Sequence, residues 1–409
     1  MRKFGFLAGL ITALGISLSA YALGTGDGYY ITFDDFAMIN TSNANTTLVS
    51  PYDFYGLGGG GQTGTFSDVS TVDNVEAKRD FNRTDGLCTI ELCFTSKALP
   101  EGATLNYKCG DVDAISFLCE KGKLYTVSAE GKTELYDDNG FYGIKMLADI
   151  DKNTYSVQSN GITLDKKFTF LNAVDYIDNF YISTTNEGTG MITLEVMRIS
   201  KDFSINEWFI TSRSNVPDDW KRLGDGTSLV RMNSSLLNDR YSLEINDTDF
   251  TEETGISHKL SYDSDELWLE YQFFLPQQVK DFGATLESGG NDVIRFGTKN
   301  LDYGYWLNGK FTPVYTLRTN LWYHAMLKVT NEGTKLYINH KLMADNIPVK
   351  NMKIDNIRYT VGKTAKGTVY IDDIIAKAMK PLPDDYVPAP VKPEKKNPDT
   401  IVGMQSCNL

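Results

Sequence analysis

Short runs in which hydrophobic and polar residues alternate recur along most of the chain. Residues 321–329 (LWYHAMLKV) and 368–374 (TVYIDDI) follow a period of two, which is typical of strands with one buried face. Residues 331–334 (NEGT) predict a hairpin turn before the next apolar run. Because no helical pattern is longer than two turns, we predict an all-β chain of antiparallel two-sheet sandwiches of the jelly-roll type.

The second half of the chain repeats the first. Four segments match in the same order: 33–36 with 206–209, 89–94 with 268–273, 178–190 with 355–367, and 190–199 with 367–376. Matches in order and at similar spacing indicate a duplication. We therefore predict two tandem β-sandwich copies, at 28–200 and 203–379.

The two ends of the chain differ from the repeats. Residues 1–22 have a basic start at Arg2 and Lys3, an apolar run and a small-x-small site at 20–22, which together predict a secretory signal peptide. The alternative for this segment is a membrane anchor, and no second apolar run of membrane length follows. Residues 380–409 are rich in Pro and Lys and predict an extended tail. The protein is thus expected to be secreted, to the extracellular space, the periplasm or the cell surface.

Composition narrows the classes of partner. Of 409 residues, 41% are hydrophobic and 12% aromatic, which is enough to form a large core. A total of 40 lysines and arginines against 53 acids gives a net charge of −13. Nucleic acid is therefore not an expected partner, because phosphate binding needs a basic surface.

Four of the five cysteines lie in the first copy, at Cys88, Cys93, Cys109 and Cys119, and Cys407 lies in the tail. Export makes disulfides available, and four cysteines allow three pairings. Cys88 and Cys93 lie on one predicted strand and point to opposite faces, so they should not pair with each other. We expect a local disulfide whose pairing the spacing leaves open.

The second copy contains four characteristic segments, at 320–324 (NLWYH), 327–329 (LKV), 337–339 (YIN) and 369–374 (VYIDDI). In these segments it resembles the concanavalin A-like lectin/glucanase superfamily, in its laminin-G-like branch. The first copy fits less well, because 139–148 (NGFYGIKMLA) lacks the tryptophan. The resemblance implies a jelly-roll fold with Trp322 in its core. Such folds serve as sugar-binding modules, adhesive domains and enzymes, so function has to be argued from the site.

One strand of the second copy carries the candidate site. Period two places Glu266, Trp268, Glu270 and Gln272 on one face of residues 266–273, opposite an apolar face. An aromatic ring stacks on a sugar while carboxylates and amides bind its hydroxyls. All five tryptophans lie in this copy. The candidate ligand-binding residues are Trp268, Glu270, Gln272, Tyr303 and Tyr305.

The same strand also suggests an enzyme. Alternating acids on one strand resemble laminarinase-type glycoside hydrolases, with Glu266 and Glu270 in the outer places and Trp268 replacing the middle acid. The first copy has Leu87, Thr89 and Glu91 there, so the acid pair is lost. We therefore predict no catalysis, and keep a divergent glycoside hydrolase or polysaccharide lyase as the alternative.

Calcium is the expected ion, because secreted sandwiches often tie their first and last strands with it. Acids stand at both ends of both copies: Asp34, Asp35 and Glu195 in the first, and Glu207, Asp372 and Asp373 in the second. Strand alternation should send Asp372 and Asp373 to opposite faces, so that only one is a ligand. Acids that protect strand edges are the alternative explanation.

Together these features predict a secreted, non-catalytic protein of two lectin-like modules that binds a polysaccharide or another cell-surface ligand. The alternative is a structural or adhesive envelope protein with a protein ligand, which a continuous exposed apolar patch would favour.

Overall fold

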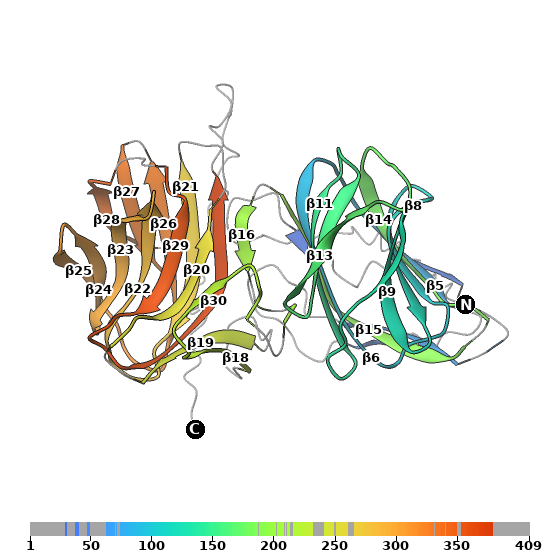
Figure 1. Ribbon diagram of the computed structural model, residues 1–409, viewed down its shortest axis with the longest axis horizontal. Helices are drawn as coiled ribbons and strands as arrows, with labels where there is room; N and C mark the ends of the chain where they lie inside the picture. Colours follow the sequence, from blue (N-terminus) through green and yellow to red (C-terminus); the bar gives the residue numbers. More distant parts are fainter. Residues whose placement is uncertain are drawn as a thin grey trace, which may run out of the picture.

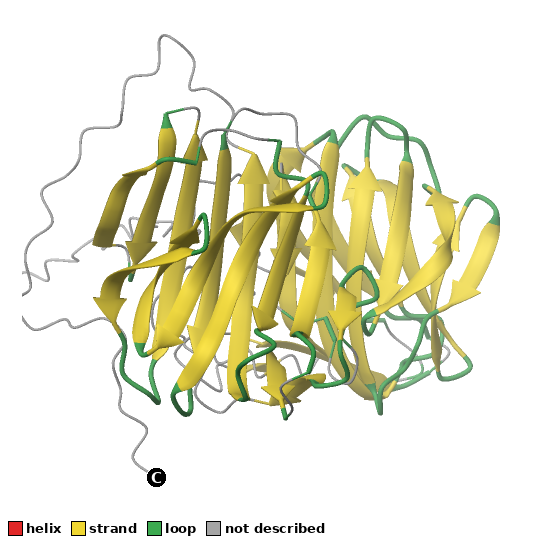
Figure 2. Ribbon diagram, turned by 60° about the vertical axis from the view of Figure 1, so that its left-hand side comes forward, coloured by secondary structure: helices red, strands yellow, loops and turns green. Residues whose placement is uncertain are grey.

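The computed structural model describes 17 parts of the chain. They are residues 29–30, 37–40, 47–49, 63–69, 71, 74–186, 188–201, 203–207, 209, 211–212, 216–231, 241–248, 251–260, 266–330, 332–339, 341–349 and 353–378. The predicted signal peptide 1–22, the tail 380–409, Asp34 and Asp35 lie outside them. Within the described parts all regular structure is β-strand (Figure 2), and no helix there could cross a membrane.

The first half of the chain forms sheets A and B, which together are called domain 1. Sheet A has the order β13 (Ile162–Thr169), β12 (Thr154–Ser159), β11 (Phe141–Asp149), β6 (Leu87–Ala98), β15 (Gly190–Lys201), β4 (Thr63–Asp68) and β3 (Thr47–Val49), with β1 (Tyr29–Tyr30) also on β15. Sheet B has the order β10 (Gly131–Glu134), β9 (Lys123–Ser128), β8 (Val112–Glu120), β7 (Thr104–Cys109), β14 (Ile177–Ser183), β5 (Glu76–Thr84) and β2 (Ala37–Asn40).

The second half forms sheets C and D, called domain 2. Sheet C has the order β28 (Lys341–Ile347), β27 (Gly333–Ile338), β26 (Trp322–Thr330), β21 (Leu267–Phe274), β30 (Gly367–Ala378), β19 (Tyr241–Asp247) and β18 (Thr227–Arg231), with β16 (Phe203–Glu207) also on β30. Sheet D has the order β25 (Lys310–Thr316), β24 (Asp302–Leu307), β23 (Asn291–Asn300), β22 (Val279–Ser288), β29 (Asn356–Val361), β20 (Thr254–Lys259) and β17 (Lys221–Leu223).

The two domains have the same strand order, element by element, in both sheets. Neighbouring strands pair antiparallel throughout, for example β6 with β11 and β21 with β26. The predicted fold class, all-β with two antiparallel sandwiches, is confirmed (Figure 1). β15 ends at Lys201 and β16 begins at Phe203, so a single residue separates the last strand of one sandwich from the first strand of the next.

The core of each domain lies between its two sheets. In β26, Tyr323, Ala325, Leu327 and Val329 are buried in the core of domain 2, as the alternation predicts. Removing such side chains from water supplies the main favourable term of folding.

A β-bulge interrupts β30, and it corrects one expectation. The pairing of β21 with β30 shifts between Glu270 and Gln272, and Asp373 has a φ of 49°. Ile371 and Ile374 both face the core, so the extra residue leaves Asp372 and Asp373 together on the outer side. The prediction that they face opposite sides is wrong, because a bulge breaks the period of two.

The predicted local disulfide is not found. Cys88, Cys93, Cys109 and Cys119 are thiols, not joined by disulfide bonds in the described structure. Cys88 faces the core from sheet A and Cys119 faces it from sheet B, while Cys93 lies on the outer face of β6. The cysteines that lie close in sequence are therefore separated by the pleat and by the two layers.

The domains meet on the outer face of sheet A. Lys145 Nζ on β11 lies 2.7 Å from Glu207 Oε2 and 3.9 Å from Asp219 Oδ2, which belong to domain 2. Asp219 also accepts a hydrogen bond of 3.2 Å from Gln158. We call these four residues the joint, and Figure 1 shows β16 between the two sandwiches.

Electrostatics and close packing both strengthen the joint. Burial lowers the pKa of the Lys145 ammonium, but Glu207 and Asp219 outweigh it and hold that pKa above its usual value. A Cβ atom at Gly143 would lie 2.1 Å from the carbonyl oxygen of Thr211, so only glycine allows this approach. The amide of Asp218 donates to the carbonyl of Gly161 at 3.0 Å. Domain 2 thus covers part of the outer face of sheet A.

Burial predicts the order in which the thiols react. Desolvation raises the pKa of Cys119 to about 12, so its thiolate is scarce at pH 8 and alkylation should be slow. Cys109 is only half-buried, so of the four described thiols iodoacetamide should label it first in the folded protein, with peptide mapping by mass spectrometry as the readout. A disulfide between two of these cysteines would contradict the structure. It would appear as a linked peptide pair whose mass is two hydrogens below the sum of the two reduced peptides.

Breaking the joint should destabilise the protein. Lys145→Met leaves the Glu207 carboxylate buried without its cation, and we expect a loss of about 3–5 kcal/mol in denaturant unfolding. Lys145→Met combined with Glu207→Leu should recover much of that loss, because both charges are gone. Lys328→Met, in a half-exposed pair with Glu266 at 3.5 Å, is the control and should cost less than about 1 kcal/mol. If Lys145→Met and the control lost the same free energy of unfolding, the joint would not stabilise the protein.

Candidate functional site

The strand that carries the candidate residues is β21, in the middle of sheet C. Leu267, Leu269, Tyr271 and Phe273 are buried in the core. The residues between them, Trp268, Glu270, Gln272 and Phe274, point to the outer face of sheet C. The division into two faces is the one that the sequence pattern predicts.

The polar members of this face are less open than a surface strand would suggest. Glu270 is 2% exposed and Gln272 is 3% exposed, whereas Trp268 is half-buried. A buried carboxylate needs partners, so its hydrogen bonds show what it does.

Both oxygens of Glu270 are engaged. The indole Nε1 of Trp268 donates to Oε1, and Nε2 of His324 on β26 lies 2.9 Å from Oε2. The Trp268 ring also lies 6.4 Å from that of Tyr337 on β27. We call Trp268 and Tyr337 the first aromatic group. Glu270 therefore fixes the orientation of the tryptophan, and His324 is a contributor that sequence spacing alone does not indicate.

A row of polar residues crosses sheet C beside this group. Its members are Ser242, Asp372, Gln272, His324 and Asn339, from neighbouring strands and one turn. Ser242 Oγ donates to Asp372 at 2.8 Å, Gln272 donates to Asp373, and the His324 amide donates to Asn339 at 2.9 Å. These groups satisfy one another, which holds the strands and their side chains in place.

On the other side of the polar row lies a second aromatic group: Tyr370 on β30, Phe274 on β21 and Trp322 on β26. Phe274 pairs directly with both of the others across the strands. Its ring centroid lies 5.5 Å from that of Trp322 and 6.0 Å from that of Tyr370. All three side chains are half-buried. Burial, and then the hydrogen bond to Glu244, raise the pKa of Tyr370 to about 12.

The position of Trp322 corrects the expectation that it lies in the core. It is the first residue of β26 and faces outward, and the next residue, Tyr323, takes the core position. The pleat decides this, because adjacent residues of a strand cannot share a face. The second aromatic group was therefore missed, although the alternation in 321–329 could have revealed it.

Tyr303 and Tyr305 do not join this face. Tyr303 is fully buried in the core, with its hydroxyl 2.5 Å from that of Tyr271, and Tyr305 packs against the same core. They lie on the inner side of sheet D, whereas Trp268 lies on the outer side of sheet C. On β24 it is Trp306 that faces outward, with its ring 4.5 Å from that of Phe311.

The two acids weighed for catalysis are held by other side chains. Glu266 lies 3.5 Å from Lys328, and Glu270 binds Trp268 and His324. In domain 1 the residue aligned with Glu270 is Glu91, which is buried and paired with Arg198 on β15. Burial raises the pKa of Glu91, against the opposing effect of Arg198.

The acids expected to bind calcium are also occupied where they are described. Glu207 binds Lys145 and the amide of Phe209, while Asp372 and Asp373 accept hydrogen bonds from Ser242 and Gln272. Glu195 lies at a register shift of β15 that matches the bulge of β30. Among the described residues, no three acidic, histidine or cysteine side chains gather to hold a metal ion.

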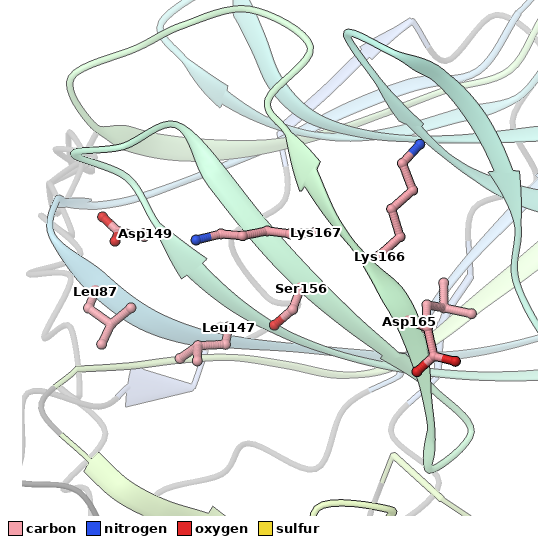
Figure 3. A pocket seen from close by; sticks show the side chains of 8 residues that line it. Leu87, Leu147, Asp149, Ser156, Asp165, Lys166 and Lys167 are labelled. Carbon is pink, nitrogen blue, oxygen red and sulfur yellow. The ribbon is translucent and has the colours of Figure 1, made fainter.

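A shallow pocket of about 380 Å³ lies on the outer face of sheet A (Figure 3), where its lining residues Leu147 and Ser156 follow Lys145 and Gln158 of the joint along β11 and β12. It is lined by Leu87, Leu147, Asp149, Ser156, Leu164, Asp165, Lys166 and Lys167. Leu87 is 56% exposed and Leu147 is 49% exposed. None of the lining residues is aromatic, so the pocket offers no ring on which a sugar could stack.

The comparison with solved structures gives distant likenesses. No protein-family model and no curated protein matches the chain. A solved sialidase is similar with a TM-score of 0.35 and 10% identity, over 70% of this chain and 32% of the sialidase. The chain thus spans about a third of that protein's length.

Two other solved structures are named for carbohydrate proteins. The CBM22-1–CBM22-2 tandem domain from Paenibacillus barcinonensis has a TM-score of 0.26 and 10% identity, over 88% of this chain and 100% of that one. Domain 4 of a GH43 extracellular arabinanase from Geobacillus stearothermophilus, in complex with arabinotriose, has a TM-score of 0.27 and 13% identity, over 38% and 76%. At these sequence identities and TM-scores, the likenesses do not support a conclusion about function.

The role of Glu270 can be tested by two substitutions of similar size. Glu270→Gln keeps an acceptor oxygen for Trp268, whereas Glu270→Leu leaves Trp268 Nε1 and His324 without their shared acceptor. We expect the Leu variant to unfold with a free energy about 1–3 kcal/mol lower than the Gln variant. Glu266→Leu is the control at the half-exposed end of the strand and should have little effect. Equal stability of the two Glu270 variants would show that the carboxylate does not fix Trp268.

Proposed function

We propose that the protein binds a carbohydrate on the outer face of sheet C and catalyses no reaction on it. The observation that carries this proposal is the half-buried Trp268 ring, fixed by Glu270 and accompanied by Tyr337 on one sheet face. A ring held in one orientation can stack on a sugar without losing conformational entropy on binding. Glu270 is a positioning residue in this proposal, because its two oxygens are already engaged.

Domain 1 does not offer the same surface. At the strand position of His324, domain 1 has Gly143, and at the position of Met326 it has Lys145. Gly143 lets domain 2 approach, and Lys145 binds it. We infer that the two domains are copies of one concanavalin A-like module, of which the first became the support and the second kept the binding face.

A secreted location and calcium remain part of the proposal. Residues 1–22 support export, since they have the parts of a signal peptide. Calcium is supported only by the acids at the strand ends, of which Asp34 and Asp35 lie outside the described residues. Chelation provides its test.

A second candidate is an adhesive protein with a protein ligand. The exposed Leu87 and Leu147, side by side at the pocket of sheet A, favour it. This apolar surface is small, and patches that mark protein contacts usually cover several hundred Å². We therefore place it second.

The test is a binding screen of the full chain against soluble polysaccharides and a glycan array. Trp268→Ala should weaken binding at least about fivefold, since stacking contributes roughly 1 kcal/mol or more. Trp306→Ala is the matched control, because this half-buried tryptophan lies on the outer face of the other sheet. Glu266→Gln should bind normally, and no sugar product should form.

A folded protein that binds no glycan would overturn the proposal, and the adhesive candidate would then lead. Loss of binding on addition of a chelator would establish a metal requirement. Product formation that Glu266→Gln or Glu270→Gln abolishes would support the enzyme.

A further inference from the structure

We infer that the binding face of domain 2 has two subsites, and that its ligand is a linear glycan chain lying along β21 with one sugar on each aromatic group. The inference rests on the proposed function and deepens it. It names the second aromatic group, Tyr370, Phe274 and Trp322, as a binding subsite.

The two aromatic groups share one face and one strand. Trp268 and Phe274 both point outward from β21. They are six residues apart in sequence, which corresponds to roughly 20 Å along a strand at about 3.4 Å per residue. A single monosaccharide is too small to reach from one group to the other, whereas an extended oligosaccharide can.

The second group has the same make-up as the first. Each combines aromatic rings with a nearby carboxylate: Glu270 binds Trp268, and Glu244 on β19 lies directly opposite Tyr370 on β30. Glu244 also accepts a hydrogen bond of 3.4 Å from Ser228 on the sheet edge. The stripe of rings and its acceptor cross β26, β21, β30 and β19.

The polar row between the groups keeps them in fixed relation. Gln272, Asp372 and His324 are nearly fully buried and bonded within the sheet. They therefore serve as a rigid spacer and not as the main contacts of the ligand. A chain held at two rigid points gains affinity because the second contact forms at a high effective concentration.

The charge of the face indicates the chemical class of the chain. The outer face carries four acids close to the rings, Glu244, Glu270, Asp372 and Asp373, and two lysines, Lys328 and Lys335, on the side of Trp268. Half-buried Glu244 can accept a hydrogen bond from a sugar hydroxyl. The excess of acids over lysines repels ligand carboxylates or sulfates. The chain should therefore be neutral and not a polyuronate or a sulfated glycan.

The experiment measures affinity against chain length for the full-length protein. Cello-, laminari- and xylo-oligosaccharides of two to eight units are titrated by calorimetry, with oligogalacturonates of the same lengths as the acidic comparison. In the series that binds, affinity should rise at least about tenfold between the shortest and the longest members. Phe274→Leu and Trp322→Leu should remove that gain and leave the affinity of the shortest member unchanged.

The variants separate this inference from the proposed function. Trp306→Leu, on the opposite outer face, is the control and should keep the length dependence. If Trp268→Ala abolishes binding while affinity is independent of length, or while Trp322→Leu binds long chains like the parent, the second subsite is wrong and the proposed function stands. Preference for oligogalacturonates would overturn the neutral class. If no series binds and the polysaccharide screen is also negative, both proposals fail.

Discussion

The pleat of the β-strand governs what each sheet in this protein can do. One set of alternate residues goes into the core, so any chemistry available to a ligand or a neighbouring domain has to come from the other set. On β21 the inner set is purely apolar and aromatic, while the outer set includes a tryptophan, a glutamate and a glutamine. Orphaned polar groups would be costly there, so the outer set forms a connected network around Glu270.

The two domains show how one face can serve two purposes. In domain 1, Glu91 pairs with Arg198, and beside them Lys145 binds Glu207 of the next domain. In domain 2, the residue aligned with Glu91 binds Trp268 and His324 instead. A few side chains on a shared strand order thus decide between contact with a domain and a surface lined by rings.

The sequence alone was enough for the fold class and for the two faces of β21, because both follow directly from the hydrophobic period. The sequence alone did not predict which residues face each other where two layers pack closely. It also did not predict where a bulge breaks the strand period of two. Because of the bulge at Asp373, this side chain points to the face of the sheet opposite to the one that simple alternation predicts. Tyr303 and Tyr305 resemble ligand-binding residues in composition, but only the stacking of sheets C and D shows that they face the core. The pairing of Glu270 with His324 joins residues 54 positions apart, which no local pattern reveals.

The connection between the sandwiches has a mechanical consequence. Only one residue lies between β15, in sheet A, and β16, in sheet C. Each of these strands is hydrogen-bonded into its own sheet, and the salt bridge of Lys145 with Glu207, at the far end of β16, ties the two domains a second time. A force that separated the two domains would therefore meet almost no extensible linker. Under such a force the two sandwiches should respond as one stiff body, because no flexible tether between them can lengthen first.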